Sequence, residues 1–116
     1  MLNELTALLR GRRYRTAVEK QFQDDVETVL KAAGRPYERE YPLSSGPIDF
    51  WLPDTGYGIE CKIKGSPSSI LQQLIRYAGE EPVSGLLLLT SRRQHSWPQA
   101  TLGSKPFGII WTGGTF

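Results

Sequence analysis

The chain has 116 residues, and its 14 Lys and Arg residues against 12 Asp and Glu residues give a net charge of +2 at pH 7. This length indicates a single domain with its own core, and no apolar run reaches the roughly 18 residues that a membrane span needs. The single cysteine and the single histidine exclude an internal disulfide and a zinc site of Cys and His ligands. Because the N-terminus also lacks the basic-then-apolar pattern of a secretory signal, we expect a cytoplasmic protein that holds any metal mostly through oxygen.

Hydrophobic periodicity and turn residues divide the chain into helices and strands. In chain order these are a helix over 2–10, a helix over 16–33, strands over 37–41, 47–52 and 58–63, a helix over 67–78, and strands over 85–90 and 107–111. Residues 91–106 show no periodic pattern and are expected to be irregular. The order predicts one α/β domain, with a mixed central sheet of about five strands flanked by helices and with residues 1–15 as a basic helical extension.

Capping residues support the ends of the predicted helices. Gly11 ends the first helix. Thr16-Ala17-Val18-Glu19 fits a capping box at the start of the second helix, and Gly34 stands where a C-terminal cap glycine belongs. Ser66 is the expected N-cap of the third helix, with Pro67 at its first position.

The strands at 47–52 and 58–63 carry charges within otherwise apolar sequence. The turn sequence Pro53-Asp54-Thr55-Gly56 joins them, and a turn centred between Asp54 and Thr55 places Asp49 opposite Glu60. Two carboxylates at that spacing repel each other, and a divalent cation between them removes the repulsion. Lys62 follows on the same face of the strand as Glu60.

Pro47-Ile48-Asp49, then Glu60-Cys61-Lys62, then a helix, resembles the active-site signature of the PD-(D/E)XK nucleases, with one extra residue between the Pro and the Asp. The order of elements is similar to the core of the restriction-endonuclease-like fold over roughly residues 16–111. The chain most resembles small standalone members of the VRR-NUC and Holliday-junction-resolvase-like kinds. The resemblance implies a Mg²⁺-dependent DNA nuclease in which Mn²⁺ can substitute.

The resemblance also implies roles for individual residues. Asp49, Glu60 and the backbone carbonyl of Cys61 would bind the metal. Lys62 would orient the attacking water and stabilise charge that develops on the phosphate. Glu19 would be a fourth acidic member on the first core helix; the alternative is that Glu19 only caps its own helix.

Further candidates lie outside this triplet. Gln73 and Tyr77 are four residues apart on one helix face, and Gln-x-x-x-Tyr at this place resembles an accessory motif of the superfamily, in which Gln73 orders the site and Tyr77 approaches the nucleic acid. His95 is expected at the surface without a catalytic role. Basic clusters suit phosphate contacts, and the residues assigned to nucleic-acid binding are Arg12, Arg13, Arg15, Arg92 and Arg93.

The expected activity is that of an endodeoxyribonuclease with no sequence specificity or with specificity for DNA structure, acting on branched or duplex DNA in a bacterial or phage-infected cell. Analogy with other minimal nucleases favours a homodimer, and targeting by a protein partner stays open. Two alternatives also stay open. One is a nucleic-acid-binding or assembly subunit that has the fold without the reaction, and the other is an α/β interaction domain with a coincidental triplet.

Overall fold

A mixed six-stranded sheet runs through the centre of the protein, and the computed structural model describes it within residues 2–112. The strands are β1 (Glu38–Leu43), β2 (Gly46–Leu52), β3 (Tyr57–Lys62), β4 (Gly85–Thr90), β5 (Thr101–Leu102) and β6 (Lys105–Trp111). They lie in the order β1-β2-β3-β4-β6-β5, in which β1, β2 and β3 are antiparallel neighbours and β3, β4 and β6 are parallel. The prediction of five strands was wrong by one, because β5 is a two-residue strand antiparallel to β6, too short to show a periodic pattern.

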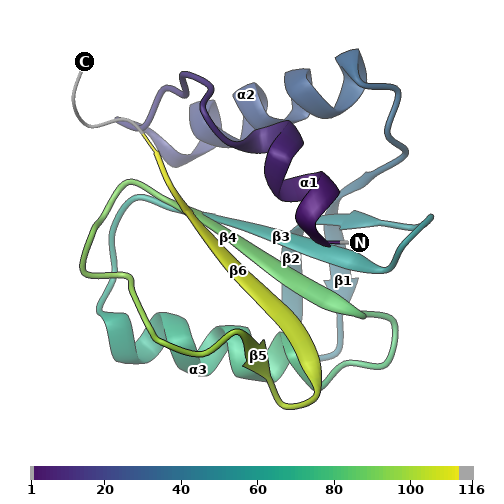
Figure 1. Cartoon of the computed structure of the whole chain (residues 1–116), viewed down its shortest axis with the longest axis vertical. Helices are drawn as coiled ribbons and strands as arrows, with labels where there is room; N and C mark the ends of the chain where they lie inside the picture. Colours follow the sequence, from purple (N-terminus) through teal and green to yellow (C-terminus); the bar gives the residue numbers. More distant parts are fainter. Residues whose placement is uncertain (1, 113–116) are drawn as a thin grey trace.

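Three helices cover the two faces of this sheet. Helices α1 (Leu2–Leu9) and α2 (Glu19–Ala32) pack on one face, and α3 (Pro67–Ala78) packs on the other (Figure 1). Every residue of β4 is buried, as expected for a strand covered on both sides. Leu5 and Leu9 of α1 are fully buried where this helix packs against β4 and β6. Helix α1 is therefore part of the core of the domain rather than an extension attached to it.

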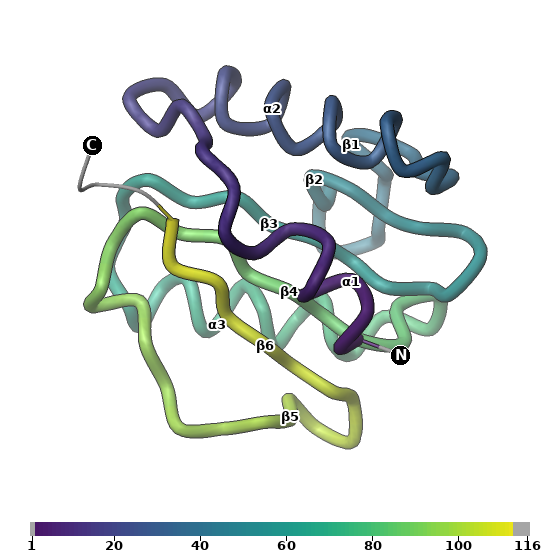
Figure 2. The backbone as a smooth tube through the Cα atoms, turned by 45° about the horizontal axis from the view of Figure 1, so that its top comes forward, coloured from purple at the N-terminus to yellow at the C-terminus, as the bar shows by residue number. Residues whose placement is uncertain are grey.

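The ends of the helices agree with the prediction except at the start of α2. Gly34 adopts a φ of 68° beyond α2, and the hydroxyl of Ser66 accepts a hydrogen bond from the backbone N–H of Ser69 at the start of α3. Helix α2, however, begins at Glu19 with Val18 as its N-cap, and no side chain caps it, so the capping box was wrong. The linker that precedes α2 crosses over the sheet (Figure 2). There the backbone N–H of Arg15 donates to Asp25 in the second turn of α2, which holds this part of the chain beside the helix.

None of the helices within residues 2–112 is long and apolar enough to cross a membrane.

The hairpin of β2 and β3 keeps its predicted register from the turn as far as Phe50. Phe50 pairs with Ile59, but no pair forms between Asp49 and Glu60, which come next. Phe50 packs in the cluster beneath α1 and α2, whereas Ile48 packs in the cluster beneath α3. Residues two apart share a face in a regular strand. Strand β2 therefore turns over at Asp49, where a regular strand would have kept Ile48 and Phe50 on one face.

The neighbouring edge strand β1 turns over at the matching position. Arg39 reaches towards α2, where its guanidinium bonds Asp24, whereas the ring of Tyr41 stacks on Trp51 on the side of α3. Between them Glu40 has a φ of 55°, the only positive value at a non-glycine residue among the described residues. Pairs of β1 with β2 form on both sides of Glu40 but not at Glu40 itself. The left-handed backbone at Glu40 thus accompanies the break in β2.

This backbone conformation predicts an unusual ranking of two substitutions. Glu40→Gly and Glu40→Ala remove the same carboxylate, but only glycine adopts a φ of 55° without steric cost. We expect Glu40→Gly to be more stable than Glu40→Ala by about 1 kcal/mol, less a few tenths for the greater freedom of glycine in the unfolded chain. Urea denaturation of both variants measures the difference. Equal midpoints would show that the strand relaxes to an ordinary conformation once the glutamate is removed.

Candidate active site

Asp49 and Glu60 form a crossed pair of hydrogen bonds where β2 and β3 part. The backbone N–H of Asp49 donates to Oε1 of Glu60 at 2.8 Å, and the backbone N–H of Cys61 donates to Oδ2 of Asp49 at 2.8 Å. Each carboxylate thus occupies a position that a backbone carbonyl of the neighbouring strand would fill in a regular ladder. The pair is therefore built into the framework of the sheet, and its position does not depend on a loop.

Lys62 completes the predicted triplet. Its Nζ lies 3.6 Å from Oε2 of Glu60, and its side chain is 19% exposed while that of Glu60 is 2% exposed. Cys61, between them in sequence, is fully buried and points into the core beneath α2. The structure therefore brings the ammonium group of Lys62 to the solvent side of a buried carboxylate pair.

Burial dominates the electrostatics of this pair. Desolvation raises the pKa of Asp49 above its usual value, and it raises the pKa of Glu60 further, with added repulsion from the charge of Asp49. The charge of Lys62 and the backbone hydrogen bonds oppose both shifts without cancelling them. The two carboxyl groups consequently favour holding a proton, or a cation, between them.

These shifts predict how the metal-free protein responds to pH. Both groups have a higher pKa in the folded state than in the unfolded state, so they stabilise the fold at low pH. Their contribution is lost as the pH rises above about 4 towards neutrality. We expect the double variant Asp49→Asn, Glu60→Gln to lose less stability than the wild type over this range in chelator.

The comparison with the double variant is needed because other acids act in the opposite direction. Hydrogen bonds in the folded state lower the pKa of four other carboxyl groups, those of Asp24, Asp25, Glu27 and Glu80. Denaturation measured at several pH values gives the difference between the two proteins. Parallel curves would show that the crossed pair does not titrate as its burial requires.

The donor atoms at the crossed pair suit a hard divalent cation. Within the described residues, Oδ1 of Asp49 accepts no hydrogen bond, and Oε2 of Glu60 has Nζ of Lys62 as its polar partner. The N–H and C=O of one strand residue point to the same edge, so the carbonyl of Cys61 faces β2 beyond the last backbone pair. Two carboxylate oxygens and one carbonyl oxygen therefore border the gap between the strands, which is the ligand chemistry that Mg²⁺ prefers.

Glu19 does not join this group as a direct ligand. In residues 2–112, no three or more His, Cys, Asp or Glu side chains are arranged so as to hold one ion. Glu19 is the first residue of α2, and its charge contributes to raising the pKa of Asp49 and Glu60. It makes no capping bond at the helix start. Glu19 is thus near enough to act on the pair electrostatically, and the alternative role as a cap is wrong.

Gln73 and Tyr77 support the site from α3. The amide of Gln73 donates to the hydroxyl of Tyr77 at 3.0 Å, and that hydroxyl donates to the backbone carbonyl of Pro47 at 2.7 Å. Pro47 precedes Asp49 by two residues, so this chain of bonds holds β2 just before its break. Tyr77 is 2% exposed, so its assignment to nucleic-acid contact was wrong: burial leaves no surface for that contact.

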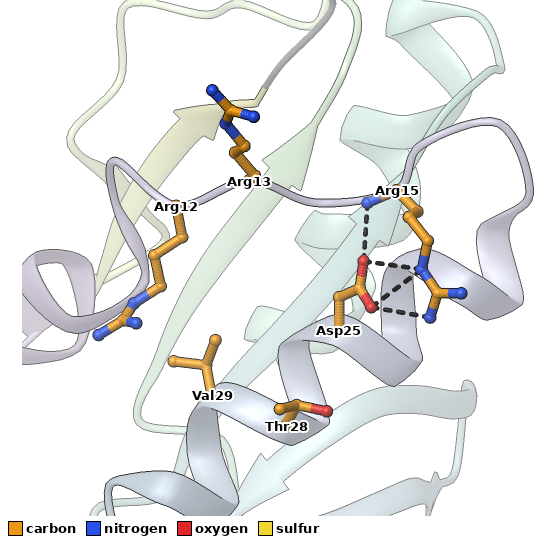
Figure 3. A pocket seen from close by; sticks show the side chains of 6 residues that line it. All are labelled: Arg12, Arg13, Arg15, Asp25, Thr28 and Val29. Carbon is orange, nitrogen blue, oxygen red and sulfur yellow. Dashed lines mark hydrogen bonds and ion pairs between the residues drawn. The ribbon is translucent and has the colours of Figure 1, made fainter. Parts of the chain in front are cut away.

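The arginines near the start of the chain gather at a different place. Arg12, Arg13 and Arg15 line a cleft of about 560 Å³ with Asp25, Thr28 and Val29 of α2 (Figure 3). Arg15 is engaged by Asp25 at 2.8 Å, and Nε of Arg12 donates to the carbonyl of Leu8. The three guanidinium groups point in different directions and do not converge on one point. This distribution suits contacts with several groups of a polyanion better than the binding of one phosphate.

At the other end of the site, His95 differs from the prediction and Arg92 keeps an exposed side chain. His95 is fully buried rather than at the surface, with its ring between the hydroxyl of Thr90 and the carbonyl of Gly65. Nε of Arg92 donates to the carbonyl of Ile63, although the side chain remains exposed. A lone histidine in a polar, aperiodic segment carries no sequence signal of burial. The left-handed conformation of Glu40 had no signal either, since it occurs at an ordinary charged residue of a strand.

Comparison of this chain with protein families, with curated proteins and with solved structures gave no match.

Proposed function

We propose that this protein is a Mg²⁺-dependent nuclease of the PD-(D/E)XK kind, with DNA as its substrate. The observation that carries the proposal is the crossed pair of Asp49 and Glu60, two buried carboxylates that replace backbone partners in adjacent strands with Lys62 at their side. Burying two like charges costs stability, and a cation offsets that cost. An antiparallel hairpin that continues into parallel strands, with helices on both faces, supports a restriction-endonuclease-like core.

The residues of the site would divide the work of phosphodiester hydrolysis. Bound between the carboxylates, Mg²⁺ would supply positive charge at the phosphate and lower the pKa of a bound water. Lys62, which is more exposed than the neighbouring Glu60, would orient the attacking water and stabilise the extra negative charge of the transition state. Gln73 and Tyr77 would hold β2 so that Asp49 keeps its position.

A cleavage assay tests this proposal directly. The purified protein is incubated with linear duplex, single-stranded, nicked and four-way-junction DNA, with Mg²⁺ or with chelator. We expect cleavage of at least one substrate that depends on Mg²⁺ and is lost in Glu60→Gln. Glu81→Gln, a change of an exposed acid outside the site, is the matched control and should cut like the wild type.

Two outcomes contradict the proposal in different ways. If the protein binds DNA but cuts none of the substrates with Mg²⁺ or Mn²⁺, it is a nucleic-acid-binding subunit with this fold. If Glu60→Gln cuts as fast as the wild type, the nuclease activity resides elsewhere or in a contaminant.

A further inference from the structure

Trp111 lies at the same end of the parallel strands as Lys62. The pairs Lys62 with Thr90 and Thr90 with Trp111 place these residues in register on three adjacent parallel strands. Paired side chains of parallel strands point to the same face. The carboxyl ends of β3, β4 and β6 lie together on one side of the molecule (Figures 1 and 2). An aromatic side chain therefore stands two strands away from the lysine of the proposed active site.

The indole of Trp111 is both exposed and held in place. It is 38% exposed, and it is one of three large hydrophobic side chains that are exposed within residues 2–112. Its Nε1–H donates to the backbone carbonyl of His95 at 3.2 Å. The guanidinium of Arg93 lies over the indole, 5.6 Å from its ring centre. An exposed aromatic ring with a fixed edge and a planar cation on its face is suited to stacking with another planar group.

The segment that holds Trp111 is itself tied to the chain after Lys62. Three donors of this segment form hydrogen bonds with backbone carbonyls at or after the end of β3: Ser91 N–H with Lys62, Arg92 Nε–H with Ile63, and His95 Nε2–H with Gly65. A carbonyl can only accept, so Nε2 of His95 carries the hydrogen. Because His95 is fully buried, its position is fixed by packing as well. The indole and the active-site strand are thus parts of one rigid unit.

The positive charge around this end of the strands indicates which kind of ligand would bind there. No acidic residue follows Glu81 in the sequence, whereas Arg92, Arg93 and Lys105 do follow it. Arg92 and Arg93 are exposed beside Trp111 and the end of β3. A ligand with planar aromatic groups on a negatively charged chain is complementary to this surface, and a nucleic acid with unpaired bases has both features.

We propose that Trp111 and Arg93 form a stacking platform for an unpaired nucleobase, on a nucleic-acid strand whose backbone runs past Lys62. This rests on the proposed function for the identity of the substrate, and it deepens it by naming a single-stranded or unpaired region as what is bound. The base stacks on this platform, whose two planar groups need no particular base identity. A fully paired duplex keeps its bases stacked internally and cannot use the platform.

Binding without metal tests the platform separately from the reaction. A short oligothymidylate is titrated into the protein in chelator while tryptophan fluorescence and the anisotropy of a labelled oligonucleotide are followed. We expect quenching by the single strand, and Trp111→Leu should weaken its binding by about tenfold or more. Affinity for a blunt duplex should change little. Arg93→Gln should also weaken single-strand binding, and this variant leaves the core untouched.

Control variants make each outcome decisive. Trp51→Phe, at a ring stacked on Tyr41, should keep both the affinity and the quenching, whereas Trp111→Phe should keep most of the affinity and lose the quenching. If the wild type binds no single strand, or if Trp111→Leu binds it equally well, the platform is wrong. If the protein cuts DNA but Trp111→Leu binds the single strand normally, the nuclease proposal stands and the platform is wrong. If the protein binds the single strand through Trp111 but cuts no DNA, the platform stands and the nuclease proposal is wrong.

Discussion

Replacing Asp49 with asparagine is expected to make the metal-free protein more stable and to abolish its stabilisation by divalent cations. The asparagine oxygen can still accept the hydrogen bond from the backbone N–H of Cys61, so the break between the strands keeps its geometry. The variant no longer carries a buried charge facing Glu60, which should raise the free energy of unfolding at neutral pH by roughly 1–3 kcal/mol. It also lacks one of the two negative ligands that a cation needs.

Thermal unfolding with and without Mn²⁺ measures both effects in one experiment. At a metal concentration a hundredfold above the dissociation constant, the wild type should gain about 2.7 kcal/mol, and Asp49→Asn should gain almost nothing. Asp54→Asn, at an exposed acid in the adjoining turn, is the matched control and should respond to metal like the wild type. A destabilised Asp49→Asn that still responds to Mn²⁺ would contradict the cation site, because the carboxylate would then serve the fold alone.

Replacing Lys62 with alanine should slow the reaction strongly while leaving metal binding in place. The ammonium group lies 3.6 Å from Glu60 but is not a metal ligand, so Mn²⁺ should still stabilise the variant. A fixed charge aimed at the transition state is worth a factor of about 10²–10³ in rate, and we expect a loss of this size in DNA cleavage. Lys62→Arg should not restore the rate, because a planar guanidinium cannot take the place of a compact ammonium.

The neighbouring Lys64 provides the control for this prediction. Lys64→Ala removes the same charge two residues further along, where the side chain is exposed beyond the end of β3. Cleavage by Lys64→Ala should stay within a few-fold of the wild type, a change typical of an outer phosphate contact. Equal losses in the two variants would mean that Lys62 acts only through general attraction of DNA. The assay is run at saturating DNA so that the rate of the chemical step is compared.

Much of the architecture was predictable because it depends on local patterns. The six-residue apolar run of β4 required cover on both faces, and Ser66 with Pro67 marked the start of α3. The turn sequence set the register of β2 with β3, and this register brought Asp49 close to Glu60. The candidate site was thus reached from the sequence through one hairpin.

The remaining features depend on contacts between distant segments. The sequence gives no sign that β1 and β2 turn over together, because the left-handed residue is Glu40 rather than a glycine. His95 is buried because the segment that follows β4 lies beside the connection that follows β3. Its ring bonds the carbonyl of Gly65, which is 30 residues away in the sequence. The spacing of Tyr77 from Gln73 likewise suggested a contact with the substrate. Only the hydrogen bond to the carbonyl of Pro47 shows that the hydroxyl of Tyr77 faces inward. Periodicity reports which face of an element is apolar, and it does not report what that face meets.

The packing of α1 has a consequence for the protein as it is synthesised. This helix leaves the ribosome before every strand of the sheet, and it packs against β6, which emerges after the other five strands. Until residues 105–111 are available, Leu5 and Leu9 lack part of the surface that buries them in the finished fold. The nascent domain must therefore keep the apolar side of this helix partly exposed until β6 emerges, and closure of the domain waits for that strand.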